Sequence, residues 1–301
     1  GVQFIFVDDG STDGSSGLLS GFCEHNSSCT LIKRRHEGVS AARNAGLLNA
    51  QGEYILFLDI DDCYEQSIFE VLSSSLEKSN ADILVFGAHV FNYNENYKLK
   101  DITPRNILYR EFQPDALFIE EGSFPYVWNS AYKRKFLLEN SLLFKQNLCV
   151  GEDLVFQFCA FPRAKVIQFI SDKLYCYHYM KYSSVMHMYD KDITLLFAQH
   201  IKIVQAVLEE WKKQGYYEPL KAQFFLWMHG FLYSDLMRLP CKEYVKGAKQ
   251  LRKMLKEQGI STIGMPVFWK KKISFFCLTH SFLGYFYRLI KNVRKSCNAD
   301  K

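Results

Sequence analysis

The sequence predicts an α/β fold in which helices flank a mostly parallel sheet, followed by a helical C-terminal region. Two observations support this. Over the first half of the 301 residues, short apolar runs typical of buried strands alternate with helical segments. This βαβ rhythm favours a parallel sheet covered on both faces. From about residue 190 onward, long segments show helical periodicity instead. We therefore expect two parts, residues 1–188 and 189–301.

Apolar periodicity and turn residues mark the elements in order. We expect strands at residues 2–7, 30–33, 53–58, 82–88, 164–170 and 174–178. The first part should contain helices at residues 38–50, 68–78, 133–140 and 152–161. The second should contain helices at 193–213, 222–237, 244–258 and 278–293. Ser40 is expected to cap the helix at 38–50, and Gly52 to stop it. Residues 90–125 give mixed signals.

Composition narrows the class of protein. The net charge is +5 with acids and bases interspersed, which is not the basic excess of a nucleic-acid binder, so no nucleic acid is expected as a partner. The nine cysteines show no spacing typical of a zinc site. We interpret them as free thiols in a reducing cytosol. No uninterrupted apolar stretch reaches the roughly 18–20 residues that a membrane-spanning helix needs.

The end of the chain mixes aromatic and basic residues over positions 268–295. Such a mixture is typical of a helix that lies in a membrane interface. One interpretation is therefore a cytoplasmic protein that attaches peripherally to the inner face of the cytoplasmic membrane. The other is a helical subdomain that packs its aromatic residues on the first part of the chain.

Aspartates cluster after two of the expected strands. Asp8 and Asp9 follow the first, and Asp59, Asp61 and Asp62 follow the third. The carboxyl ends of parallel strands share one rim, where open α/β sheets bind their ligands. Crowded carboxylates repel unless a cation or hydrogen-bond donors offset them. Their hard oxygens suit Mg²⁺ or Mn²⁺ bound together with phosphates. The alternatives are an ordinary turn at the first cluster and a helix cap at the second.

Four segments resemble the family 2 glycosyltransferases of GT-A fold, which are bacterial enzymes of polysaccharide assembly. They are FIFVDDGSTDGS, EGVSAARNAGLLNAQGEYILFLDIDD, VWNSAYKRKFL and GEDLVF, in the family's order over residues 1–185. The resemblance implies a GT-A-like catalytic domain over residues 1–188. Family members begin with an earlier strand and helix that this sequence does not show. We therefore expect an N-terminally truncated domain, and expect activity from the full-length gene product.

The resemblance also implies roles in binding a nucleotide-sugar donor. Asp9 would hydrogen-bond the base, with Asp8 beside it in the same motif. Asp59 would reach the ribose or support the site. Arg43 would face the diphosphate, its alternative being a surface arginine, and Asn44 would brace that loop.

Further roles concern metal and catalysis. Asp61 would ligate Mn²⁺ or Mg²⁺, and Asp62 is expected either beside the metal or as a helix cap. Asp153 would be the catalytic base, with Glu152 next to it; the alternative is an acidic first turn of a helix. Two residues have open assignments. Trp128 would stack under a sugar ring or lie in the core, and His178 would contact the diphosphate or metal or be structural.

The function implied is inverting transfer of a sugar from a nucleotide diphosphate, UDP by analogy, to a hydroxyl of a growing glycan or lipid-linked acceptor. A non-catalytic or degenerate nucleotide-sugar binder is the main alternative. A nucleotidyltransferase would also carry metal-bound aspartates, but the visible N-terminus shows no glycine-rich basic loop. A helical membrane scaffold would explain only the last third of the chain.

Overall fold

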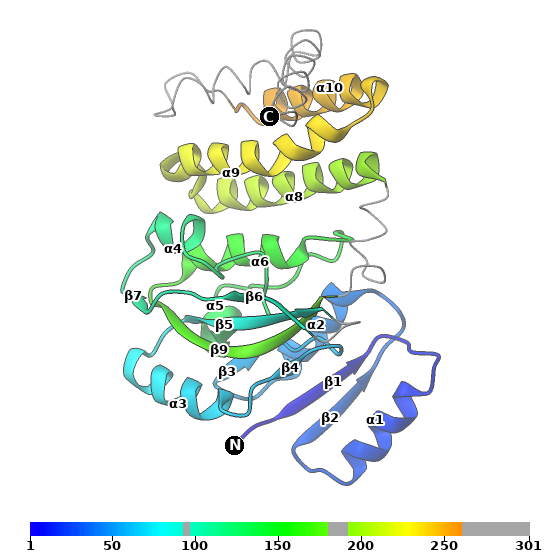
Figure 1. Ribbon diagram of the computed structural model, residues 1–301, viewed down its shortest axis with the longest axis vertical. Coiled ribbons are helices and arrows are strands. Elements are labelled where there is room, and N and C mark those ends of the chain that lie inside the picture. Colours follow the sequence, from blue (N-terminus) through cyan, green and yellow to red (C-terminus); the bar gives the residue numbers. More distant parts are fainter. Residues whose placement is uncertain (93–96, 180–191, 261–301) are drawn as a thin grey trace. The chain divides into compact units, whose positions relative to one another are not determined.

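The computed structural model describes residues 1–92, 97–179 and 192–260 (Figure 1). The chain divides into two compact units, residues 1–182 and 183–301. The first unit is α/β and the described part of the second is helical, which confirms the predicted fold class. The boundary expected after residue 188 lies outside the described residues. So do the helix expected at 278–293 and the aromatic and basic positions 268–295.

The first unit contains all the described strands. They are β1 (Phe4–Asp8), β2 (Cys29–Lys33), β3 (Tyr54–Leu56), β4 (Cys63–Tyr64), β5 (Ile83–Asn92), β6 (Lys98–Ile102), β7 (Ile107–Tyr109), β8 (Ser130–Lys133) and β9 (Ile167–Tyr179). Its helices are α1 (Ser15–Glu24), α2 (Val39–Asn49), α3 (Ile68–Ser79), α4 (Pro114–Phe118), α5 (Arg134–Glu139) and α6 (Glu152–Ala160), followed by a 3₁₀ turn, Phe161–Arg163.

These strands form two sheets. β1 and β2 pair in parallel, and the other seven described strands form a sheet with the central path β3-β8-β5-β9-β4. In that larger sheet β5 and β9 are parallel, whereas β3–β8, β4–β9, β5–β6, β5–β8 and β7–β9 are antiparallel. The expectation of a mostly parallel sheet is therefore wrong for the larger sheet. A parallel neighbour needs a long crossover, and residues 90–125, which supply β6 and β7, hold no helix long enough to make one.

Strand β5 runs through the centre of the larger sheet, and residues 83–88 along it are buried. Alternate side chains of a strand point to opposite faces. On one face, Leu84 and Phe86 pack in an apolar cluster with Leu72 of α3. On the other, Tyr132 of β8 packs edge-to-face against Phe156 of α6, with ring centroids 5.4 Å apart. Figure 1 accordingly shows α3 and α6 on opposite sides of the sheet.

Most expected elements are present, with several local differences. The two strands expected between residues 164 and 178 are one strand, β9. The elements α1, β4 and β8 were not anticipated, and β6, β7 and α4 lie in the region of mixed signals. Ser40 is not the cap of α2: it lies inside the helix and is buried. Gly38 occupies the cap position with φ 91°, a conformation that favours glycine, and its N–H donates to Asp9 Oδ2 at 2.7 Å. A carboxylate distant in sequence thus holds the backbone just before α2, and no side chain makes a cap hydrogen bond to this helix.

The described part of the second unit consists of α8 (Ile193–Gln214), α9 (Tyr217–Arg238) and α10 (Cys241–Glu257). Asp192 caps α8 by accepting hydrogen bonds from two backbone N–H groups of its first turn. Between α8 and α9, His200 is paired with the buried carboxylate of Asp235. Among the described residues, no helix combines the length and apolar character needed to cross a membrane.

Candidate functional site

The acidic loop, residues 59–62, lies between β3 and β4 and is held by β9. The Tyr175 hydroxyl donates to Asp62 Oδ2 at 2.8 Å and accepts from the backbone N–H of Asp59 at 3.3 Å. The backbone N–H of His178 donates to Asp62 Oδ1 at 2.6 Å. Both oxygens of Asp62 therefore have donors from β9, and the loop is fixed to the sheet at that point.

Asp61 and Asp62, expected together beside a metal, differ in environment. The Asp62 side chain is 0% exposed. Burial raises the pKa of Asp62 to about 6, although the hydrogen bonds from His178 and Tyr175 act in the opposite direction. Asp61 is exposed to solvent. Asp61 is thus the accessible acid of the pair, while Asp62 anchors the loop and is neither a helix cap nor open to a solvent-borne ion.

Arg43 on α2 connects the acidic loop to the start of α6. Its Nη2 donates to Asp59 Oδ1 at 2.9 Å, and its Nη1 donates to Glu152 Oε1 at 2.9 Å and also to Asp153 Oδ1. The Arg43 side chain is 11% exposed, so it is not a surface arginine. One guanidinium therefore joins three acids, of which Asp153 lies 110 residues from Arg43 in sequence.

The same cluster perturbs Asp153. Burial raises the pKa of Asp153 well above its ordinary value, the charge of Arg43 lowers it, and the neighbouring Glu152 and Asp59 raise it. A carboxyl group with a raised pKa can take up a proton nearer neutral pH than an ordinary aspartate, which suits a general base. Asp153 lies in the first turn of α6, as the alternative interpretation supposed, but it is tied to the other acids as well.

The first aspartate pair shapes the backbone near β1. Asp8 accepts from the backbone N–H of Ser11 at 2.8 Å, and this bond is the main cause that lowers its pKa to about 2. Asp9 accepts from the backbone N–H groups of Glu37 and Gly38 at the start of α2. Asp8 thus closes the turn that the alternative interpretation proposed. Asp9 binds the same helix that carries Arg43, and its side chain is 18% exposed.

Trp128 does not have the environment of a sugar platform. It is 2% exposed and stacks on Tyr175 and Tyr126, with ring centroids 4.3 Å and 4.6 Å away. A ring covered to this extent offers no face to a ligand, so the core alternative is the correct one. His178 stacks on Phe91 with centroids 5.8 Å apart, and its side chain is 24% exposed. Its backbone N–H bonds Asp62, and its Nδ1 lies 3.7 Å from Asp62 Oδ1.

Two supporting residues differ in how visible they are in the sequence. Asn44 was expected to brace a loop, and it exchanges hydrogen bonds with the backbone of Phe144, donating to its C=O at 2.9 Å and accepting from its N–H at 2.8 Å. Tyr175 was not anticipated, because a tyrosine within an apolar strand carries no motif. The only signal in the sequence is that tyrosines alternate along this strand, at positions 175, 177 and 179.

Few of the described residues are placed so that they could ligate a metal ion. In the part of the chain that the structure describes, no group of three or more His, Cys, Asp and Glu side chains is placed to hold an ion. An exposed carboxylate such as Asp61 nevertheless matches the way Mg²⁺ binds through one or two carboxylates and substrate phosphates. The residues present thus fit an ion that arrives with a diphosphate, and do not form a closed metal cage.

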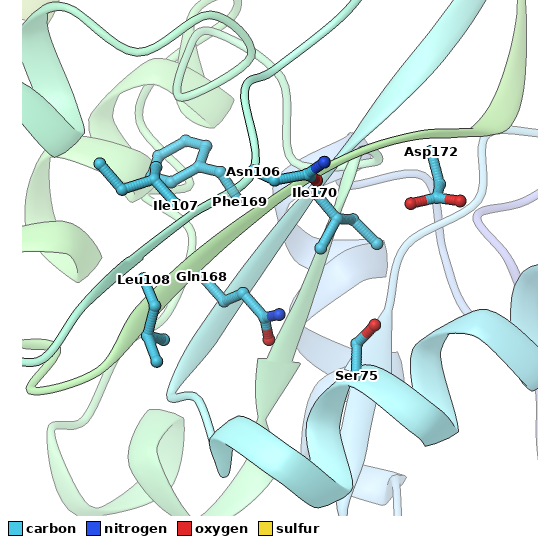
Figure 2. A pocket seen from close by; sticks show the side chains of 8 residues that line it. All are labelled: Ser75, Asn106, Ile107, Leu108, Gln168, Phe169, Ile170 and Asp172. Carbon is cyan, nitrogen blue, oxygen red and sulfur yellow. The ribbon is translucent and has the colours of Figure 1, made fainter.

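A separate groove of about 400 Å³ lies between α3 and the strands β7 and β9 (Figure 2). Ser75, Gln168 and Asp172 contribute polar side chains to its lining. None of the residues expected to bind a donor, metal or acceptor lines it.

The comparisons with known proteins agree with one another. The profile described as glycosyl transferase family 2 matches residues 1–140. A cholesterol galactosyltransferase of Borreliella burgdorferi is 28% identical over 183 residues, which cover 58% of this chain and 51% of that protein. An uncharacterized glycosyltransferase of Bacillus subtilis, EpsJ, is 27% identical over 179 residues, covering 58% and 52%. The chain spans about half the length of these curated relatives.

A solved structure extends the likeness to the fold. Residues 1–349 of S. aureus TarS, in complex with UDP-GlcNAc, superpose with a TM-score of 0.54 at 16% identity, covering 95% of this chain and 82% of that one. At this identity the likeness concerns the fold alone, and it confirms the GT-A-like architecture. The motifs VDDGS, SAARNAG and DIDD all fall inside the matched region. The similarity to glycosyl transferase family 2 thus covers residues 1–140 and includes these three motifs.

Proposed function

We propose that the chain transfers a sugar from a nucleotide diphosphate to an acceptor hydroxyl. The observation that carries this proposal is the Arg43 cluster, which joins Asp59 of the acidic loop to Glu152 and Asp153. The family match and the glycosyltransferase relatives support the reaction type. UDP is the nucleotide we propose, because the structural neighbour TarS was crystallised with UDP-GlcNAc.

Asp153 is the base in this proposal. It would accept the proton of the acceptor hydroxyl while the oxygen attacks the anomeric carbon and the diphosphate departs, so that direct displacement inverts the configuration. Its raised pKa favours proton uptake, and Arg43 holds it in position. Glu152 shares the same guanidinium and would maintain its alignment. Both terminal nitrogens of Arg43 already bond acids, so contact of either with the diphosphate would compete with these partners.

Asp9 and Asp61 complete the donor site that we propose. Asp9 would hydrogen-bond the base from its position at the start of α2. Asp61 would hold Mn²⁺ or Mg²⁺ together with the donor phosphates. A bound divalent ion would neutralise the charge that grows on the departing diphosphate. His178 and Asp62 would act only by supporting the acidic loop.

The acceptor is proposed as a hydroxyl of a glycan or of a lipid-linked glycan. The Borreliella relative is named for transfer to cholesterol, whose acceptor group is also a hydroxyl. A hydroxyl acceptor must lose its proton as it attacks. This requirement is consistent with the role of base given to Asp153.

The test is nucleotide diphosphate release from a panel of UDP-, GDP- and dTDP-sugars, with and without an acceptor lipid extract. We expect acceptor-dependent UDP release that Asp153→Asn lowers at least 100-fold while donor binding persists. Asp172→Asn, an exposed acid outside the cluster, is the matched control and should release UDP at the parent rate. Donor binding without release, whatever the acceptor, would favour a non-catalytic nucleotide-sugar binder.

The metal assignment is tested separately by calorimetry with UDP. We expect tight binding in Mn²⁺, weak binding in chelator, and loss of the difference in Asp61→Asn. Equal affinity in Mn²⁺ and chelator for the parent protein would remove the ion from the proposal and leave the base assignment untouched.

A further inference from the structure

Two thiols lie opposite each other where the acidic loop joins the sheet. Cys63, the first residue of β4, is the antiparallel partner of Cys176 on β9. Directly opposed residues of an antiparallel pair extend their side chains to the same face. Cys63 is exposed and Cys176 is half-buried. Cys176 Sγ donates to Glu65 Oε1 at 3.0 Å.

The strand register permits a covalent link. The backbone N–H of Glu65 donates to the C=O of Leu174 at 3.0 Å, which makes these two residues a hydrogen-bonded pair. Because hydrogen-bonded and open pairs alternate, Cys63 and Cys176 are again a hydrogen-bonded pair. The Cα atoms of such a pair are about 5.5 Å apart, within the ~4.4–6.8 Å span of disulfides. The Cβ atoms of such a pair lie roughly 1 Å further apart than those of a relaxed disulfide. The link would therefore be strained and readily reduced.

We propose that Cys63 and Cys176 are a modification site, at which a hydroperoxide-class oxidant forms a reversible disulfide that fixes the acidic loop to β9. Cys63 directly follows the loop's last residue, Asp62. Cys176 lies between Tyr175 and His178, the two residues of β9 that hold Asp62. β4 has only two residues, so the loop is otherwise attached on that side by a very short ladder. The disulfide would add a covalent bond to this ladder and to the hydrogen bonds that hold Asp62.

The chemistry requires one two-electron oxidant. The exposed sulfur of Cys63 attacks the distal oxygen of the hydroperoxide, the O–O bond breaks, and a sulfenic acid and an alcohol (water from hydrogen peroxide) form. The sulfur of Cys176 then attacks the sulfur of Cys63, the S–O bond breaks, and the hydroxyl leaves as water with the Cys176 proton. Both thiols are oxidised and the peroxide is reduced. A dithiol reductant reverses the link by thiol–disulfide exchange.

A second thiol pair supplies the control. Cys23 lies at the end of α1 and Cys29 at the start of β2, and both are half-buried. Neither is exposed as Cys63 is, and neither adjoins the acidic loop. Cys23→Ser therefore removes a comparable thiol from the same unit without touching the proposed link.

The experiment is non-reducing peptide mapping of the whole chain after treatment with hydrogen peroxide and alkylation of the remaining thiols. The peptides that contain Cys63 and Cys176 should be joined in the parent protein and in Cys23→Ser, and be separate after dithiothreitol. Cys63→Ser should yield no link, and Cys176→Ser should leave a sulfenic acid at Cys63 that dimedone traps. Hydrogen exchange of the amides of residues 59–65 should slow at least threefold on oxidation in the parent protein, and remain unchanged in Cys63→Ser.

Two results would overturn the proposal. One is oxidation of Cys63 to sulfinic acid, or its linkage to another cysteine, while Cys176 stays free. The other is a Cys63–Cys176 link that leaves exchange in the acidic loop unaltered. Both readouts use mass alone, so they are independent of whether the chain transfers sugars.

Discussion

The hydroxyl of Tyr175 donates a hydrogen bond of 2.8 Å to a carboxylate, Asp62, that has no solvent-exposed side-chain surface. The same hydroxyl accepts the backbone N–H of Asp59, so one side chain of β9 contacts both ends of the acidic loop. Asp61, between those ends, is left exposed. Asp61 is therefore exposed because Asp59 and Asp62 on either side of it are bonded to β9. The contribution of these bonds can be tested by measuring protein stability, without any ligand.

Tyr175→Phe removes one donor from a buried carboxylate without changing the shape of the ring. We expect a loss of about 1–3 kcal/mol in the free energy of unfolding, because Asp62 then lacks a partner that solvent cannot replace. Tyr177→Phe, two residues along the same strand, is the control and should lose less than about 1 kcal/mol. Urea denaturation of both variants measures the difference. Equal losses would mean that the Tyr175 hydroxyl contributes nothing specific.

The raised pKa of Asp62 makes a prediction about pH. Its folded-state pKa of about 6 exceeds the ordinary 3.8, so the folded state binds more protons between these values. Stability contributed by this group is therefore present below about pH 4 and is lost as the pH rises to about 6. Relative to Asp62→Asn, the parent protein should lose about 1 kcal/mol across this window. Denaturation of both proteins at pH 4, 5, 6 and 7 measures the change, and a parallel pair of curves would contradict the assignment.

The parts of this site that lie in short motifs could be predicted from the sequence. Asp9 and Asp59 stand out as acids at the ends of apolar strands, whereas Arg43 and the Glu152–Asp153 pair were predicted from the resemblance to the family 2 glycosyltransferases. The contacts among these residues could not be predicted from the sequence. That one guanidinium joins Asp59 to Asp153 depends on how α2 and α6 pack, which no local pattern specifies.

Arg43→Lys keeps one positive charge and loses the planar fork that reaches three acids. Because the charge of Arg43 lowers the pKa of Asp153, weakening that contact should raise this pKa further. If Asp153 is the base, the acidic limb of kcat/KM for UDP release should move to higher pH by about one unit, with activity lower at pH 6 than at pH 8. Unfolding measured in parallel should show a loss of up to about 3–5 kcal/mol, as for a disrupted buried ion cluster. An unshifted acidic limb in a folded variant would separate Arg43 from Asp153.

Asn44→Ala tests the brace between α2 and residues 140–150. The substitution leaves the buried N–H and C=O of Phe144 without their side-chain partner, at an expected cost of about 2–4 kcal/mol. Asn49→Ala is the matched control on the same helix, since its side chain bonds only the carbonyl of Ala45. Chemical denaturation should find Asn49→Ala at least about 1 kcal/mol more stable than Asn44→Ala. The reverse order would show that the brace is incidental.

One mistaken expectation, for Ser40, and one open assignment, for Trp128, have a common physical origin. Ser40 suits a helix cap by residue type, and Trp128 suits a sugar platform, but both are buried by contacts made from elsewhere in the chain. Gly38 takes the cap position of α2 and is held by Asp9, and the faces of Trp128 are covered by tyrosines of β9 and of the segment before β8. The parallel character expected of the sheet failed for a related reason, because residues 90–125 concealed strands that pair without a crossover. Residue type predicts which role a side chain is suited to. Packing against distant parts of the chain decides whether the side chain takes that role.

The core position of Trp128 leads to the last prediction. Trp128→Phe should cost about 1–3 kcal/mol of stability, because the smaller ring leaves part of the stack with Tyr175 and Tyr126 unfilled. Trp211→Phe, at a fully buried position of α8, should cost a similar amount. Neither variant should change the KM for a UDP-sugar by more than about threefold, since a side chain that is 2% exposed presents no ring face to a sugar. A tenfold rise in KM for Trp128→Phe with unchanged stability, and none for Trp211→Phe, would return Trp128 to the donor site.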